Sequence, residues 1–419
     1  MTHNSSSPWS FVRLIAGVAV LVALLTWIAG WALPVVVGAI VVMVMGHEFG
    51  HFITAKRSGM QVTDFFVGFG PVVWSFTRGE TRYGVRAFLL GGYVKVPGMS
   101  WSETVDPALE SRTYRSASYP RKVLFASAGS LMHLVMALLL AWASLALVGL
   151  PSASAVGIAG FTKWSGHVEN AAQLGGLHVG DRIVSVDGRR VVNATTLVRE
   201  VHDHVGSPIT VVVLRRGHDV TLRVTPVDGR TLKVAGGPLA TGSTPQGFIG
   251  VMLAPQVVRA SVLAAIPSAL HQVTSTISAS LHAMVHVFSP GEFSSLFRQV
   301  TSPAVAANPA VQATRPQSIV GVVRVAVQGA HAGVGTLLVI LMAVNIFVGV
   351  LNMLPMLPLD GGHVAVATYE RVRSRRDRRY HADINRLIPV AYAFMSVLVV
   401  LFAFTLYLDI VHPMANPFH

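Results

Sequence analysis

The sequence has no cysteine and unusually few charged residues. Without cysteine the chain can form no disulfide, no Cys-ligated zinc site, no iron–sulfur cluster and no thiol nucleophile. Charged residues make up 12% of the 419 residues, and 52% are hydrophobic, whereas soluble domains carry about 25% charged residues. This shortage of charge predicts that a good part of the chain is surrounded by the lipid bilayer.

Acidic residues are scarcer than basic ones. The chain has 19 Asp and Glu against 32 Lys and Arg, which gives a formal net charge of +13. In a membrane protein, such an excess usually reflects Lys and Arg in cytoplasmic loops. We therefore expect no nucleic-acid partner.

A long uncharged run begins near the N-terminus. Residues 14–46 contain no charged residue and no histidine. At about 1.5 Å per residue, a helix of this length exceeds the ~30 Å of a bilayer core, and a signal peptide has an apolar region of only about 7–15 residues. We interpret the run as one long helix kinked at Pro34. The alternative is two segments, of which only the second, about 34–56, crosses fully.

Three further apolar runs bring the expected number of transmembrane helices to about four. They cover residues 123–150, 334–354 and 387–410. Basic residues cluster in 56–122 and in 371–386, which predicts that both loops are cytoplasmic. The soluble region between the second and third spans is then extracytoplasmic, in a multi-pass protein of the plasma or inner membrane.

Between these spans the composition becomes that of a soluble domain. The stretch "GGLHVGDRIVSVDGRRV" (175–191) has a turn–strand–turn pattern and predicts a PDZ-like domain. A small β-domain that only blocks access is the alternative. The expected organisation is an N-terminal transmembrane segment (1–56), a cytoplasmic-side β-region and loop (57–122), the second transmembrane helix (123–150), the PDZ-like domain (154–235), a linker with interfacial helices (236–333), the third transmembrane helix with its loops (334–386), and the fourth helix with the C-terminus (387–419).

The sequence "HEFGH", His47 to His51, closes the first apolar run. Residues i and i+4 lie on one helix face, so His47 and His51 can bind one zinc ion, and the intervening Glu48 can polarise a metal-bound water. Two interface histidines and a solvated glutamate are the alternative. Ionisable side chains are costly in a membrane and usually functional there, which favours a metal site.

A catalytic zinc site needs three protein ligands and an open position. Asp360 is the best candidate for the third ligand, because it is the first charged residue after a long apolar run and lies between "LPMLP" and "GG". The alternative is an aspartate that caps the next helix. His363 follows three residues later, as a ligand or, more simply, an interface histidine.

Taken in order, these motifs resemble the site-2 protease family. "HEFGH", then "GFGP" and "GGYV", the PDZ-like insert and "NMLPMLPLDGG" are similar to the bacterial RseP-like (regulator of sigma-E protease) intramembrane zinc metalloproteases, and closest to actinobacterial single-PDZ members. The resemblance implies a polytopic α-helical membrane protein with a membrane-associated β-sheet after the first helix and an inserted extracytoplasmic PDZ-like α+β domain.

The resemblance also implies an activity. The protein would be an intramembrane zinc endopeptidase that cleaves transmembrane helices of single-pass membrane proteins, such as anti-sigma factors, in regulated intramembrane proteolysis. One Zn²⁺ per chain would be held by His47, His51 and Asp360, a zinc-bound water would be activated by Glu48, and Asn352 would help to place the substrate.

The second span departs from the family pattern. Relatives usually have a Gly-Pro-x-x-Asn-like sequence there, whereas this chain reads "AGSLMHL" and places His133 where the asparagine would be. His133 could hydrogen-bond the tetrahedral intermediate or a group beside the zinc. It could equally be a histidine satisfied within the helix bundle.

Two other classes of function compete with the peptidase. A non-catalytic PDZ-bearing membrane scaffold would not need Glu48 or Asp360, and both are present. A zinc-binding transporter should carry more intramembrane carboxylates than this chain does.

Overall fold

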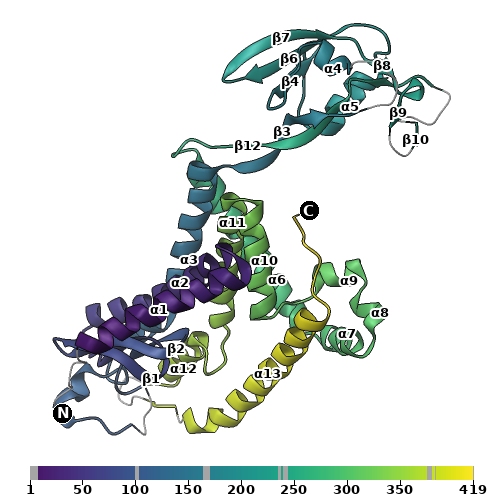
Figure 1. The fold of residues 1–419 in the computed structure, drawn as a ribbon. Helices are drawn as coiled ribbons and strands as arrows, with labels where there is room; N and C mark the ends of the chain where they lie inside the picture. Colours follow the sequence, from purple (N-terminus) through teal and green to yellow (C-terminus); the bar gives the residue numbers. More distant parts are fainter. Residues whose placement is uncertain are drawn as a thin grey trace. The chain divides into compact units, whose positions relative to one another are not determined.

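The computed structural model describes residues 8–99, 103–163, 170–234, 237–238, 244–374, 380–382 and 384–418. These residues divide into two compact units. A helical unit comprises Met1–Ser144 and Ile266–His419, and a strand-rich unit comprises Leu145–Ala265 (Figure 1). Part of the predicted basic loop, residues 375–379, lies outside the described residues.

The helical unit contains long apolar helices and one β-hairpin. Its elements are α1 (Pro8–Ala29), α2 (Ala32–Arg57), β1 (Asp64–Arg78), β2 (Thr81–Lys95), α3 (Tyr119–Ala143), α6 (Ala265–Val287), α7 (Pro290–Thr301), α8 (Pro303–Ala306), α9 (Pro309–Thr314), α10 (Ile319–Ala332), α11 (Val334–Asn352), α12 (Asp360–Arg373) and α13 (Ile388–Val411).

Five of the described helices are long and apolar enough to cross a membrane, namely α1, α2, α3, α11 and α13. The sequence predicts about four, and the prediction of one kinked helix at the N-terminus is wrong. The chain breaks at Gly30, which has φ +71, a left-handed conformation that ends helices. Pro34 lies instead in the first turn of α2, where its missing N–H removes no helical hydrogen bond.

Helix α3 is the centre of the helical unit and packs against α2, α11 and α12. The approach to α2 is close: a Cβ on Gly50 would lie 2.5 Å from the carbonyl oxygen of Ala128. A buried cluster of Ala32, Val36 and Met43 joins the first half of α2 to α10 and α11. The second half of α2, which carries the histidines, is therefore held at a defined distance from α3.

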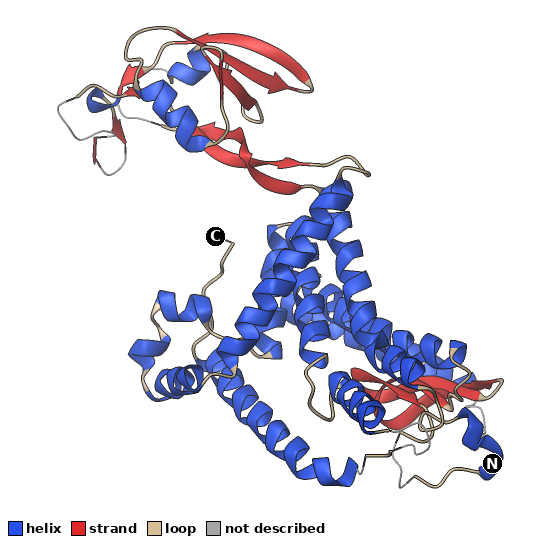
Figure 2. Ribbon diagram, turned by 180° about the vertical axis from the view of Figure 1, so that it is seen from behind, coloured by secondary structure: helices blue, strands red, loops and turns tan. Residues whose placement is uncertain are grey.

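The expected β-region after α2 is present as an antiparallel hairpin of β1 and β2 (strands of the helical unit in Figure 2). Glu80, between the two strands, joins the hairpin to its surroundings. Its carboxylate lies 2.5 Å from Lys56 Nζ at the end of α2 and 2.8 Å from the Arg112 guanidinium. The hairpin is thus tied to the helix that carries the "HEFGH" sequence.

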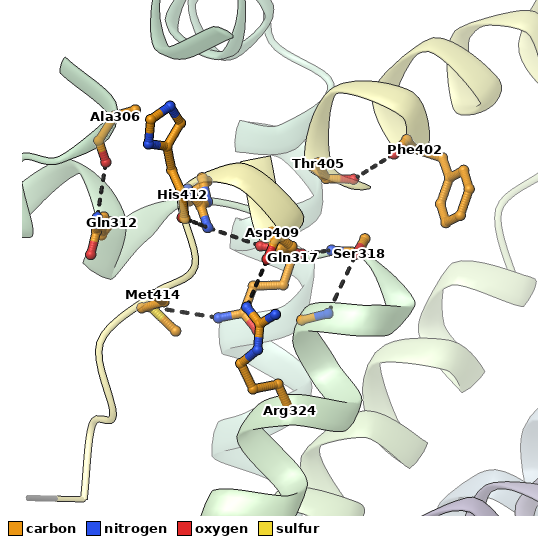
Figure 3. Close-up of polar contacts among 12 residues, drawn as sticks. Ala306, Gln312, Gln317, Ser318, Arg324, Phe402, Thr405, Asp409, His412 and Met414 are labelled. Carbon is orange, nitrogen blue, oxygen red and sulfur yellow. Dashed lines mark hydrogen bonds and ion pairs between the residues drawn. The ribbon is translucent and has the colours of Figure 1, made fainter. Parts of the chain in front are cut away.

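The last helix is attached by a buried ion pair. Arg315 lies 2.9 Å from a carboxylate oxygen of Asp409 near the end of α13, and their side chains are 1% and 2% exposed. The other carboxylate oxygen accepts from the Ser318 backbone N–H, and Arg324 donates to the Asp409 carbonyl (Figure 3). These contacts join α13 to the start of α10.

The strand-rich unit is built on an antiparallel sheet whose strands differ in length. Its elements are β3 (Leu150–Phe161), α4 (Ala171–Leu174), β4 (Arg182–Val186), β5 (Arg189–Arg190), α5 (Ala194–His202), β6 (Ile209–Arg215), β7 (His218–Val224), β8 (Val227–Asp228), β9 (Lys233–Val234), β10 (Gly237–Pro238), β11 (Gly247–Phe248) and β12 (Val251–Val258).

The main sheet has the order β12-β3-β4-β6-β7. Because β12 pairs along β3, residues of the predicted linker after 235 belong to this unit, which extends beyond the predicted 154–235. A core that includes Ile183, Leu197, Ile209 and Ile249 lies between the sheet and α5.

Candidate metal centre

Three side chains from two helices bring their ligand atoms together. The Nε2 atoms of His47 and His51, on α2, are 3.1 Å apart. Each lies 3.4 Å from Oδ2 of Asp360, the first residue of α12. Within the described part of the chain, these three residues form the group of His, Asp and Glu side chains that could hold a metal ion.

The geometry of this group fits zinc. Ligand atoms about 2.0–2.1 Å from a tetrahedral zinc lie about 3.3–3.4 Å apart, close to the three separations found here. Oδ2 of Asp360 is buried and has no hydrogen-bond partner among the described residues. A buried, unpaired carboxylate oxygen is costly, and a cation between the three side chains would remove that cost.

The surroundings of His51 set its ring for metal binding. Its Nδ1 lies 2.8 Å from the Phe125 carbonyl oxygen and therefore carries the proton, which leaves the lone pair on Nε2. Gly129 of α3 makes room beside the ring, since a Cβ there would lie 2.5 Å from His51 Nε2. Two features of α3 thus prepare the α2 ligands.

Asp360 reaches the histidines because the loop before α12 folds tightly. A Cβ on Gly362 would lie 2.6 Å from the Leu357 backbone nitrogen, and one on Gly361 would overlap the Met353 backbone. Only glycine fits such close backbone contact. The two glycines of "LDGG" therefore allow the first turn of α12 to place the carboxylate at the metal group.

Glu48 lies in the same cavity as the metal group. The cavity has a volume of about 200 Å³, and its lining residues are His47, Glu48, His51, Val94, Met99, Phe125, Ala126, Pro358, Asp360 and His363. Val94, on β2, lines the cavity together with Glu48. Gly92 of the same strand packs so closely on Glu48 that a Cβ there would overlap its side chain.

His133 lies beside the metal group without joining it. Its ring is centred 5.1 Å from the His47 ring, but its Nδ1 is hydrogen-bonded to Oδ1 of Asn345 on α11, at 2.9 Å. His133 is thus hydrogen-bonded within the bundle and packed against His47, and both interpretations of its role stay predictions.

The remaining two candidates have different positions. Asn352 is the last residue of α11, is partly exposed, and does not line the cavity that holds Glu48. Its role in placing the substrate stays a prediction. His363 does line this cavity but lies outside the three-residue metal group, so the structure gives no support to a ligand role for it.

Sequence reasoning missed several residues that shape the site. Asn345 had a usable signal, because it is a polar residue in the middle of an apolar spanning helix, and such residues are usually functional. Gly129 and the Phe125 carbonyl had none. Their importance arises from the close packing of α3 on α2.

Comparison with known proteins decides the family. The sequence profile of peptidase family M50 matches residues 35–396. The chain belongs to peptidase family M50, the site-2 protease family. The match begins after α1, so the additional N-terminal helix lies outside the family profile.

Curated relatives agree with this assignment. The chain is 33% identical over 406 residues to zinc metalloprotease Rip1 of Mycobacterium tuberculosis, which covers 90% of this chain and 96% of the relative. It is 30% identical over 421 residues to zinc metalloprotease Rip1 of Mycolicibacterium smegmatis, with the same coverage. This M50 peptidase is therefore a zinc metalloprotease, and the resemblance seen in the motifs is confirmed.

Proposed function

We propose that this M50 peptidase is an endopeptidase that cuts transmembrane helices of single-pass membrane proteins, such as anti-sigma factors. The observation that carries the proposal is the shared cavity of Glu48 and the metal group. Two of the three metal-binding residues and Glu48 lie on α2, a helix apolar enough to span a membrane. This position supports peptide-bond cleavage within the membrane.

The proposed roles follow from the positions of the side chains. His47, His51 and Asp360 would hold zinc, which when bound supplies a positive charge that polarises water and a substrate carbonyl. The Glu48 carboxylate takes a proton from the attacking water and passes it to the leaving amine. Gly92 of β2 packs directly against the Glu48 side chain beside this cavity.

A helical substrate must unwind before it can be cut, because its amides are hidden in hydrogen bonds. We propose that β2 holds the unwound segment by strand pairing. The support is that β2 lies at the cavity: Val94 lines it and Gly92 packs on Glu48.

For the strand-rich unit we propose a PDZ-like, extracytoplasmic domain that screens substrates. Its support is a cavity of about 170 Å³ between α5, with Leu197 and Val201, and the segment 247–253. Sites beside a strand and a helix suit extended peptides. The basic residues Lys56 and Arg57 at the end of α2 support a cytoplasmic position for that helix end, and for the nearby metal centre.

The test is cleavage of a model single-pass substrate by wild type, Glu48→Gln and Asp360→Ala, with the zinc content of each purified protein measured. We expect Glu48→Gln to keep its zinc and lose cleavage, and Asp360→Ala to lose both. Cleavage at the wild-type rate by Glu48→Gln would refute the proposed mechanism. Full zinc occupancy in Asp360→Ala would refute the proposed ligand set.

A further inference from the structure

The cavity at the metal group contains one polar side chain without a proposed role. Five of its lining residues are polar: His47, His51, Asp360, Glu48 and His363. The first three would hold the metal and Glu48 is the proposed base. The rest of the lining is apolar, so the imidazole of His363 is the remaining side chain there that can donate a hydrogen bond.

His363 and Glu48 come from different helices. Glu48 is on α2, beside β2, whereas His363 lies in the first turn of α12, three residues after Asp360. A peptide carbonyl that enters the cavity therefore meets a base from one helix and a hydrogen-bond donor from another. Hydrolysis of an amide needs both, since negative charge develops on the carbonyl oxygen as water attacks.

The other nearby histidine is placed differently. His133 does not line the cavity, and its Nδ1 is engaged by Asn345. His363, in contrast, has no hydrogen-bond partner within the described residues, and its ring makes an edge contact with Tyr114 at 6.4 Å between centroids. That contact fixes the ring against a buried aromatic while leaving its nitrogens unpaired.

We propose that His363 is a second catalytic residue, whose imidazole N–H donates a hydrogen bond to the carbonyl oxygen of the scissile peptide. This inference rests on the proposed peptidase function of the same site. In the attack step a C–O bond forms, the carbonyl π electrons move to the oxygen that His363 contacts, and Glu48 takes the water proton. In the second step the C–N bond breaks, the carbonyl re-forms, and Glu48 returns the proton to the amine.

The experiment compares two matched substitutions in the full-length protein. His363→Phe keeps an aromatic ring for the contact with Tyr114 but removes the donor, and His363→Gln keeps a donor but removes the ring. The kcat and KM for a model single-pass transmembrane peptide that the wild type cleaves are measured in detergent micelles, together with the zinc content. Glu48→Gln is included to test the proposed role of Glu48 separately.

We expect His363→Phe to retain one zinc per chain and a KM close to wild type, and to lose about 10²–10³-fold in kcat, the usual effect of removing one donor to a developing oxyanion. His363→Gln should recover at least a tenth of the wild-type kcat. An unchanged kcat in His363→Phe would overturn the proposal. Loss of zinc in His363→Phe would also overturn the proposal. The same holds if the kcat of His363→Gln is as low as that of the Phe variant, because either result indicates a structural role for His363. Cleavage at the wild-type rate by Glu48→Gln would instead refute the proposed role of Glu48, and failure of the wild type to cleave any transmembrane peptide would refute the proposed function.

Discussion

His133 of α3 and Asn345 of α11 form a buried hydrogen bond, with Nδ1 of the histidine 2.9 Å from Oδ1 of the asparagine. A second hydrogen bond decides which partner donates. Asn345 Nδ2 donates to the Leu341 carbonyl, so the Asn345 oxygen faces His133 and accepts from it. His133 is 2% exposed to solvent and Asn345 is 0% exposed. His133 in turn makes a ring contact with His47, so Asn345 on α11 is linked through His133 to a residue of the candidate metal group on α2.

Replacing Asn345 by leucine should destabilise the protein. Asn345→Leu keeps the side-chain size but leaves the buried Nδ1–H of His133 without an acceptor, at a cost of about 1–3 kcal/mol. The measurement is the thermal unfolding midpoint in detergent, which should fall.

The control is the double variant Asn345→Leu/His133→Leu. Removing both partners leaves no buried polar group unpaired, so the double variant should be more stable than the two single effects added together. Additive effects would show that the two side chains do not interact.

Gly129→Ala should impair zinc binding. The new methyl group would overlap His47 and press on His51 Nε2, since the Cβ would lie 2.5 Å from that atom. We expect lower zinc occupancy after dialysis against a mild chelator, and a matching loss of cleavage.

Gly38→Ala on α2 is the matched control, because a Cβ there meets nothing within 4 Å. Replacing a helical glycine by alanine at an open position should leave zinc content unchanged and stabilise the helix by about 0.5–1 kcal/mol. Equal zinc content in the two variants would contradict the close-packing argument.

Protonation of Glu80 at acidic pH should weaken the attachment of the β1–β2 hairpin to α2. Burial acts to raise the pKa of this carboxyl, but hydrogen bonds and charges from Arg112 and Lys56 outweigh burial, so its pKa is lowered from 4.5. A carboxyl whose folded pKa is depressed contributes stability above its unfolded pKa, and this contribution is lost as the pH falls through the folded value.

We therefore expect amide-exchange protection of the hairpin, corrected for intrinsic rates, to hold at pH 6 and to fall below about pH 4.5. In Glu80→Gln the protection should already be reduced at pH 6, and the acid-dependent step should be smaller. A step of the same size in Glu80→Gln would assign it to another group.

Much of the architecture is predictable because its signals are local. The apolar runs that form α3, α11 and α13 are continuous in the sequence, and so is the predicted β-region that contains the hairpin. The N-terminal run predicts one helix kinked at Pro34, whereas the structure has two helices, α1 and α2, separated at Gly30. Pro34 lies in the first turn of α2, where a proline removes no helical hydrogen bond. Gly30 adopts a left-handed conformation, which ends the preceding helix.

The sequence by itself determined that His47 and His51 share one face of an apolar helix, since a spacing of four residues is enough for that, and that Glu48 lies between them in the chain. It also singled out Asp360, by the rarity of charge in an apolar context. Only the tertiary structure decided that Asp360 meets the two histidines and that His133 turns to Asn345 while His363 faces the cavity. These relationships join helices far apart in the chain, and they depend on side-chain packing between α2, α3, α11 and α12, which no local pattern encodes.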